Sequence, residues 1–207
     1  MANPLRRRER WTIAARLIDK CFGALLLAAI FALRGSAQTA STNIQAQQDQ
    51  AGFKEFSSRA QQYTKLHKRL EQSLPQLKIT DQPELIAAHQ QALAKKISEA
   101  RPDARPGNIF APRAKDAFQR AIAREFKGSE ATNALATIQQ GAPVKEVQLQ
   151  VNQVYPEGLP YTSVPPTLLL KFPRLPDELG YRIVDKDLVL LDVKANLVVD
   201  LMAKAIP

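Results

Sequence analysis

Cysteine is nearly absent from this chain. The single cysteine, Cys21, lies near the N-terminus, just before an apolar run. If the segment around it is removed, the remaining chain has no thiol. That excludes a disulfide framework, a thiol nucleophile and cysteine metal sites. Stability must then come from a packed core, which a chain of about 170 residues can form as one domain.

Recognisable catalytic motifs are also missing. The sequence has no GxSxG, HExxH, GxGxxG, phosphate loop or Ca²⁺ loop, and it has only two histidines. We therefore expect no cofactor and favour a protein that is not an enzyme. The alternative is a hydrolase-type enzyme whose acidic residues converge only in the fold.

A long apolar run is missing as well. The longest, Cys21–Leu33, has 13 residues, whereas a membrane-spanning helix needs about 20. A basic segment precedes the run, and Gly35 and Ala37 follow it as a small-residue cleavage site. This is the plan of a secretory signal peptide over residues 1–37. We expect a periplasmic or secreted protein; the alternative is an inner membrane anchor formed by an uncleaved N-terminus.

The positive charge is concentrated in this leader. The chain carries 29 Lys and Arg against 20 Asp and Glu, a net charge of +9. Residues 1–37 hold seven of the basic and two of the acidic residues, so they supply more than half of that excess. The basic balance therefore does not indicate nucleic-acid binding.

Helical periodicity occupies the first half of the remaining chain. Residues 38–52 are polar and are expected to be flexible. An apolar seam at three- and four-residue spacing then predicts a helix over 53–74, and Asp81, Pro83 and Glu84 mark the start of the next. The short link between the two helices predicts a helical hairpin. The seam consists of Phe53, Phe56, Ala60, Tyr63, His67, Leu70 and Leu74, and the second helix is expected to bury Ile86, Leu93 and Ile97.

Further helices and then strands follow. A proline-rich loop at 101–112, a possible internal boundary, precedes two more predicted helices that end near Gln140. Period-two alternation predicts a half-buried strand around Val147–Val151, and residues 155–176, with six prolines, form an ordered loop with one short helix. Strands of the stretch 181–201 complete a small antiparallel sheet. The fold class is therefore α+β, in one domain over 53–207.

The run GNIFAP, the segment YPEGLPYTSVPPTLLLKFPRLP and the terminal stretch YRIVDKDLVLLDVKANLVVDL carry a resemblance. They resemble a family of uncharacterised exported bacterial proteins with a similar proline-rich segment before a similar C-terminal stretch. The likeness covers about half of the chain, from Arg101 onward. It implies a signal peptide and a shared fold, and no activity or catalytic residue.

Four aspartates stand in the C-terminal stretch: Asp185, Asp187, Asp192 and Asp200. A hairpin closed at Asn196 would set Asp192 opposite Leu197 and Asp200 opposite Val189. Asp192 and Asp200 would then lie on opposite faces of the sheet, because side chains alternate. The four aspartates are therefore interpreted as turn formers and strand-end charges rather than a catalytic pair.

Two weaker candidate sites remain. His67 and His89 would lie at the same level of a helical hairpin and could form a metal or proton-sensing pair, although no third ligand has a fixed spacing, so no metal site is predicted. One face of the third helix is basic and could bind another envelope protein or an anionic cell-wall or lipid component, or it could be a solvated face. It consists of Arg113, Arg120, Arg124 and Lys127. The function expected from the sequence is an exported envelope protein that binds or supports without catalysis.

Overall fold

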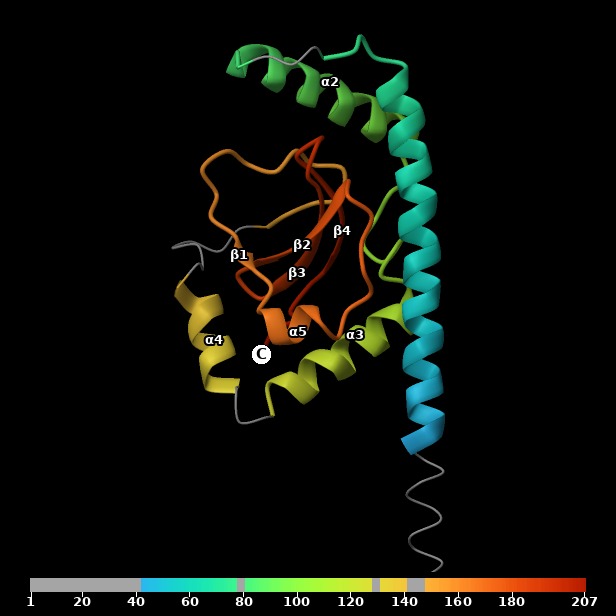
Figure 1. The fold of residues 1–207 in the computed structure, drawn as a ribbon, viewed down its shortest axis with the longest axis vertical. Helices are drawn as coiled ribbons and strands as arrows, with labels where there is room; N and C mark the ends of the chain where they lie inside the picture. Colours follow the sequence, from blue (N-terminus) through green and yellow to red (C-terminus); the bar gives the residue numbers. More distant parts are fainter. Residues whose placement is uncertain (1–41, 78–80, 128–130, 141–147) are drawn as a thin grey trace, which may run out of the picture. The chain divides into compact units, whose positions relative to one another are not determined.

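The structure is a computed structural model, and it describes residues 42–77, 81–127, 131–140 and 148–207. It is an α+β fold in which helices lie beside a four-stranded antiparallel sheet of order β1-β2-β3-β4 (Figure 1). Contacts divide the chain into units Met1–Gln47 and Gln48–Pro207. In the described part of the chain, no helix is both long and apolar enough to cross a membrane.

The first described helix, here called the long helix, covers residues 42–72. Its buried seam includes Phe56, Ala60, Tyr63 and His67, as the periodicity predicts. The expectation of a flexible segment over residues 38–52 needs correction from residue 42 on, because this part is helical. Asp49 is buried there, and Gly52 lies so close to the next layer that a Cβ would sit 2.5 Å from the Arg113 carbonyl oxygen. Tertiary contacts thus outweigh the polar composition.

Three further helices follow: α2 (Pro83–Ala100), α3 (Pro112–Glu125) and α4 (Ala131–Gln140). The C-terminal half of α2 is buried through Leu93 and Ile97, but Ile86 is 44% exposed, so the prediction that Ile86 is buried is wrong. Residues 81–88 of this region are exposed. The apolar residues of α3 recur at helical spacing, which predicts an inward face of Ala114, Phe118, Ala121, Ile122 and Phe126. The structure agrees, with Phe118 and Ile122 fully enclosed.

The segment 148–159 covers one side of the sheet without forming a regular strand. Leu149 is buried, yet residues 148–153 have no strand structure, and Val154 makes only an isolated bridge to Leu197. The part of the predicted strand before residue 148 lies outside the described residues. The proline-rich region then forms β1 (Thr162–Ser163) and the short helix α5 (Pro166–Leu169), which agrees with the prediction of an ordered loop with one short helix.

The strands β2 (Leu179–Val184), β3 (Asp187–Asp192) and β4 (Leu197–Met202) form a meander. The turns have the predicted chemistry, since Asp185 and Asn196 adopt φ of 53° and 48°, the left-handed region that Asp and Asn tolerate well. Asp192 lies opposite Leu197, as predicted.

A β-bulge in β4 changes the rest of the register. Leu191 pairs with Val198 but Leu190 pairs with Asp200, so Val199 is an extra residue. Asp200 therefore lies opposite Leu190 and not Val189. Because directly opposite residues share a face, the prediction that Asp192 and Asp200 lie on opposite faces is wrong: the bulge brings both to the same face.

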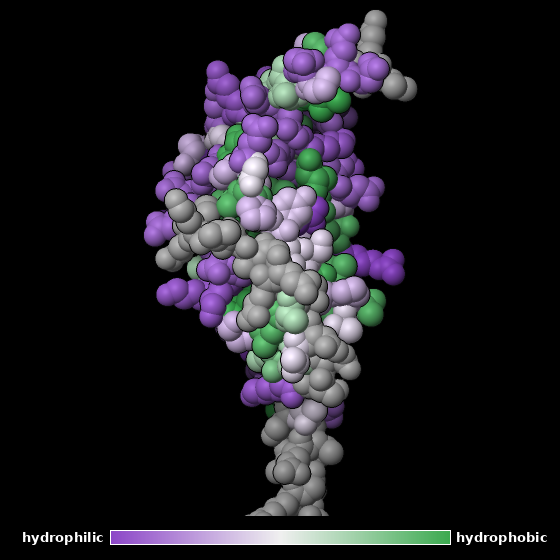
Figure 2. All heavy atoms as spheres, turned by 90° about the vertical axis from the view of Figure 1, so that its left-hand side faces the viewer, coloured by the Kyte–Doolittle hydropathy of each residue, from purple (hydrophilic) through white to green (hydrophobic). Residues whose placement is uncertain are grey.

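The two faces of the sheet have separate cores. The helix-covered face packs Leu188, Leu190 and Leu197 against side chains of the long helix, α2, α3 and α5. The loop-covered face packs a smaller cluster from the sheet against the segment 148–159: Val184, Val189, Leu191, Val198 and Leu201 with Leu149, Tyr155 and Leu159. On the side that Figure 2 shows, apolar and polar side chains are interspersed among the described residues.

Candidate functional site

A buried polar cluster joins the long helix to the end of β3. Tyr63 donates a hydrogen bond of 2.6 Å to Oδ2 of Asp192, and Nδ1 of His67 lies 2.5 Å from the same oxygen. Oδ1 accepts hydrogen bonds from the backbone N–H groups of Lys194 and Ala195. Four donors thus surround one fully buried carboxyl group, which is how a buried carboxylate is stabilised.

The second nitrogen of His67 also faces an acid. Nε2 lies 3.4 Å from a carboxylate oxygen of Glu71, which in turn forms an ion pair of 3.0 Å with Lys194. Burial alone would lower the pKa of His67, but the hydrogen bond to Asp192 and the charges of Asp192 and Glu71 outweigh it, so the pKa lies above the usual value. The surroundings of the imidazole, which lies between two carboxylates, therefore favour its charged form.

Asp200 makes an equally dense set of hydrogen bonds, mainly to the loop 101–112. Its carboxylate accepts hydrogen bonds from the backbone N–H groups of Gly107, Ile109, Phe110 and its own neighbour Leu201, at 2.5–2.8 Å. Burial raises the pKa of Asp200 even though these bonds act to lower it. Asp200 thus fixes the loop that leads into α3.

Arg101, at the C-terminal end of α2, lies between the two clusters. Its guanidinium stacks over the Tyr63 ring at 5.1 Å and donates hydrogen bonds to the side-chain oxygen of Asn152 and the Val199 carbonyl. Burial lowers the pKa of Arg101, while Asp200 acts in the opposite direction. Among the described residues, no carboxylate lies within ion-pair distance (4.0 Å) of this guanidinium. Its charge is therefore balanced only by neutral oxygens and by the field of more distant groups.

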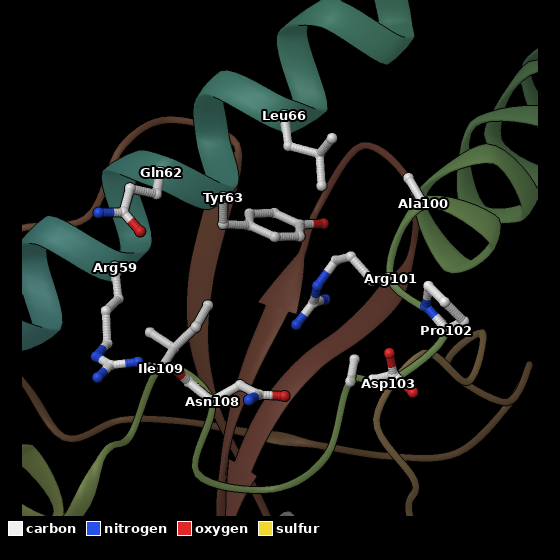
Figure 3. A pocket seen from close by; sticks show the side chains of 11 residues that line it. Arg59, Gln62, Tyr63, Leu66, Ala100, Arg101, Pro102, Asp103, Asn108 and Ile109 are labelled. Atoms are coloured by element: carbon white, nitrogen blue, oxygen red, sulfur yellow. Dashed lines mark hydrogen bonds between the residues drawn. The ribbon is translucent and has the colours of Figure 1, made fainter.

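Arg101 lines an open cavity of about 420 Å³ between the long helix and the loop 101–109. Figure 3 shows the Arg101 guanidinium beside the Tyr63 ring, with Arg59 reaching toward the loop from the long helix. Arg59 donates a hydrogen bond to the Asn108 carbonyl and pairs with Glu55 at 2.9 Å. The rest of the wall is mixed polar and apolar: Gln62, Leu66, Ala100, Pro102, Asp103, Ala104, Asn108 and Ile109.

The geometry separates the reactive groups from the cavity. His67 and Asp192 are fully buried, and both imidazole nitrogens face carboxylates. Tyr63 does line the cavity, but its hydroxyl donates to Asp192 and its pKa is raised by burial and by that carboxylate. A phenol held in this way cannot act as a base near neutral pH. What the wall offers a ligand is guanidinium N–H groups and an aromatic ring.

The basic face predicted on α3 has a partner in the structure. Arg120 and Arg124 both bind Asp49 of the long helix, at 2.6 and 2.7 Å. These two pairs and the proximity of both arginines lower the pKa of Asp49 against the opposing effect of burial. Arg113 and Lys127 are exposed, and in the described ranges neither has an ion pair within 4.0 Å. Half of the predicted face thus joins two helices.

The two histidines occupy different environments. His67 belongs to the buried cluster, whereas His89 lines a separate cavity of about 580 Å³ with Glu71, Leu77 and Val193. Across the residues that the structure describes, no three His, Cys, Asp or Glu side chains gather where they could hold a metal ion. Glu71 is the residue that connects the two environments, since its carboxylate faces Nε2 of His67.

Sequence reasoning missed the roles of Tyr63, Arg101, Asp192 and Asp200. A signal for two of them was present: an Asp inside a strand of otherwise apolar residues, flanked by apolar residues on both faces, has to be hydrogen-bonded if it is buried. The partners could not be predicted from the sequence, because His67 lies 125 residues from Asp192 and the loop lies about 90 residues from Asp200.

Comparisons with protein-family models, with curated proteins and with solved structures found no match. The function of this α+β protein therefore has to be argued from its own geometry, and the resemblance of its C-terminal half to exported bacterial proteins stays a prediction.

Proposed function

We propose that the protein is an exported, non-catalytic envelope module that binds an anionic group in the cavity between the long helix and the loop 101–109. The observation that carries the proposal is Arg101. Its half-buried guanidinium stacks on Tyr63, lines the cavity and has only neutral hydrogen-bond acceptors among its described neighbours. A carboxylate or phosphate oxygen in the cavity would supply the missing negative charge.

A second cation supports this ligand class. Arg59 lines the same cavity and uses one N–H group on the Asn108 carbonyl and two on Glu55. The wall also contains the acidic residue Asp103, which is exposed and, among the described residues, forms no hydrogen bond or ion pair with either arginine. Two guanidinium groups on opposite walls suit an anion with several oxygens better than a neutral ligand.

The alternative of a hydrolase rests on the cluster of Tyr63, His67 and Asp192, which is an acidic site that forms only in the fold. Three features argue against catalysis there. The carboxylate and the imidazole are fully buried, Nε2 faces Glu71 instead of the cavity, and the phenol is held in its protonated form. General acid–base catalysis needs a titrating group within hydrogen-bond reach of the substrate.

Isothermal titration with two probes tests the binding site: citrate as a polycarboxylate and pyrophosphate as a phosphate. We expect one of them to bind, and Arg101→Gln to weaken binding at least tenfold, since a buried charge-assisted pair contributes about 1.5–3 kcal/mol. Arg105→Gln is the matched control, because Arg105 is on the same loop, exposed and outside the cavity wall; its affinity should stay within twofold.

Arg101→Gln also removes two hydrogen bonds to the fold, so thermal unfolding has to accompany the titration. If that variant does not fold, Arg59→Gln decides, and it should weaken binding several-fold. Equal binding by wild type and both variants, or binding of neither probe, would contradict the proposal. The exported location has its own test, the intact mass of protein isolated from the native envelope, where loss of residues 1–37 is expected.

A further inference from the structure

Half of one edge of the sheet has no neighbouring strand. β2 has six residues, but β1 pairs only with its Arg182 and Ile183. On that side, the described residues provide no strand partner for Leu179, Gly180 and Tyr181. A strand edge presents backbone N–H and C=O groups to any extended chain that approaches it; here the N–H of Leu179 already donates to the Pro176 carbonyl, so the remaining groups of this edge are the ones such a chain could bond.

A cavity of about 460 Å³ lies along this free edge. Four consecutive residues, Leu179–Arg182, line it. Successive side chains of a strand point to opposite faces, so a cavity that touches four in a row lies beside the strand and not over one face. It also touches Ser163 and Val164, where the chain leaves β1. An extended chain in this cavity would therefore continue the line of β1.

The opposite wall of the cavity is apolar. It consists of side chains from α5 and the segment after it: Leu169, Phe172, Pro173 and Leu175. Beside it, Leu170 is 87% exposed, the largest exposure among the large apolar side chains of the described residues. Exposed leucines next to a free edge favour a ligand with apolar side chains.

The charges at this cavity have one sign. Arg174 and Arg182 line it, and its wall as described contains no Asp or Glu. Neither arginine has an ion pair within 4.0 Å among the described residues. Arg182 stacks over Tyr161 at 4.9 Å, and its Nε is buried without a hydrogen-bond partner.

Arg182 also occupies the edge itself. Its Nη1 donates a hydrogen bond of 2.8 Å to the Tyr181 carbonyl, and it lies 3.0 Å from the position that a Cβ on Gly180 would take. The guanidinium thus covers a carbonyl that an added strand could use, and Gly180 leaves room for it. An incoming acidic side chain would attract the guanidinium away from this carbonyl.

We propose that an extended acidic segment of a partner protein docks here as an added strand, antiparallel to β2 and in line with β1. Its backbone bonds the free part of β2, its apolar side chains enter the wall formed by α5, and its carboxylates bind Arg174 and Arg182. This is recognition by strand addition, in which backbone bonds supply affinity and side chains supply specificity. The site is distinct from the Arg101 cavity, and neither proposal depends on the other.

Fluorescence anisotropy with labelled eight-residue peptides tests the proposal. An alternating Val-Glu peptide should bind, and an alternating Val-Lys peptide should bind at least tenfold more weakly. The decisive probe is a Val-Glu peptide N-methylated at every second residue, which keeps the charges but cannot pair with a strand edge. Binding by the N-methylated peptide as tight as by the parent would overturn strand addition.

Variants locate the site. Arg174→Glu should weaken binding of the Val-Glu peptide at least tenfold, while Arg113→Glu, an equal charge change at an exposed position on α3, should change it less than threefold. Slower hydrogen exchange at the N–H of Tyr181 on binding is the expected structural signature, because the N–H of Leu179 already donates to the Pro176 carbonyl. Unchanged affinity of Arg174→Glu for the Val-Glu peptide would exclude the acidic peptide as the occupant. Self-association of the wild type that Arg174→Glu abolishes, but that added peptide does not abolish, would exclude it as well, and this result would identify a second copy as the occupant.

Discussion

The two faces of the sheet are attached to the rest of the protein by different chemistry. The helix-covered face is held by buried side chains: Asp192 binds the long helix and Asp200 binds the loop before α3. The segment 148–159, which packs apolar side chains on the other face, is joined to the edge of β4 by backbone bonds, such as those from the N–H of Asn152 to the Val198 carbonyl and from the N–H of Tyr155 to the Asn196 carbonyl.

The difference follows from what each covering layer has to offer. The backbone groups inside a helix are already bonded to one another, so a helix can be fixed to a sheet only through side chains. An irregular segment has free backbone groups that must find partners when buried, and the nearest partners are those of β4. Asp192 is joined to the long helix in this way through side chains, whereas Asp200, on the same face, binds free backbone N–H groups of an irregular loop.

The largest expected effect comes from Asp200→Ala. The change leaves four backbone N–H groups without their acceptor, and buried unsatisfied donors cost about 1–3 kcal/mol each. We expect a loss of roughly 4 kcal/mol in the free energy of unfolding, measured by urea denaturation. Asp187→Ala is the matched control, since Asp187 accepts a single exposed bond from Lys204; a loss there as large as that of Asp200→Ala would show that the loop attachment is not special.

The apolar cores of the two faces can be compared through neighbours in β3. Leu190→Ala opens a cavity in the helix-covered core and should cost about 3–4 kcal/mol, whereas Leu191→Ala faces the segment 148–159, which can relax, and should cost about 2 kcal/mol. Urea denaturation of both variants measures the difference. Equal losses would mean that the loop-covered face is as rigid as the other.

The pH dependence of stability tests the polar attachment at His67. Because its folded-state pKa is raised, the stabilisation is fully present below the unfolded value of about 6.5 and is lost as pH rises through the folded-state pKa. We expect the stability advantage of wild type over His67→Gln to shrink as pH rises above the unfolded-state value of about 6.5. An advantage that does not change with pH would show that the imidazole is not held in its charged form.

The smallest effect is expected at the rim of the helix-covered side. Arg124 is 58% exposed and shares Asp49 with Arg120, and exposed ion pairs contribute about 0.2–1 kcal/mol. Arg124→Gln should therefore lower stability by about 0.5 kcal/mol, and less in high salt. A loss above about 2 kcal/mol in urea denaturation would place this pair among the main attachments instead.

The sequence alone predicts the local parts of this fold well. The seam of the long helix, the inward face of α3 and the turns at Asp185 and Asn196 all follow from periodicity and backbone preference. The side chains that join distant elements were not predictable in the same way. Nothing near Asp192 in the sequence identifies Tyr63 or His67 as its partners.

Two of the wrong predictions from the sequence have a clear physical cause. The face of Asp200 was mispredicted because strict alternation of side chains cannot reveal a bulge. The extra residue Val199 moves the following side chains of β4 to the face opposite the predicted one. Residues 42–52 were mispredicted as flexible because their composition is polar, whereas Asp49 and Gly52 are fixed by contacts with α3. In both cases a contact far along the chain overrides the local pattern.

The arginine that covers the free edge of β2 has a consequence for behaviour at high concentration. Two identical copies that approach edge to edge bring Arg174 and Arg182 of one against those of the other, and like charges at short range repel. The same pair of side chains thus opposes edge-to-edge pairing of two copies. High salt screens this repulsion, and it is the condition under which we expect edge-to-edge association of copies to appear first.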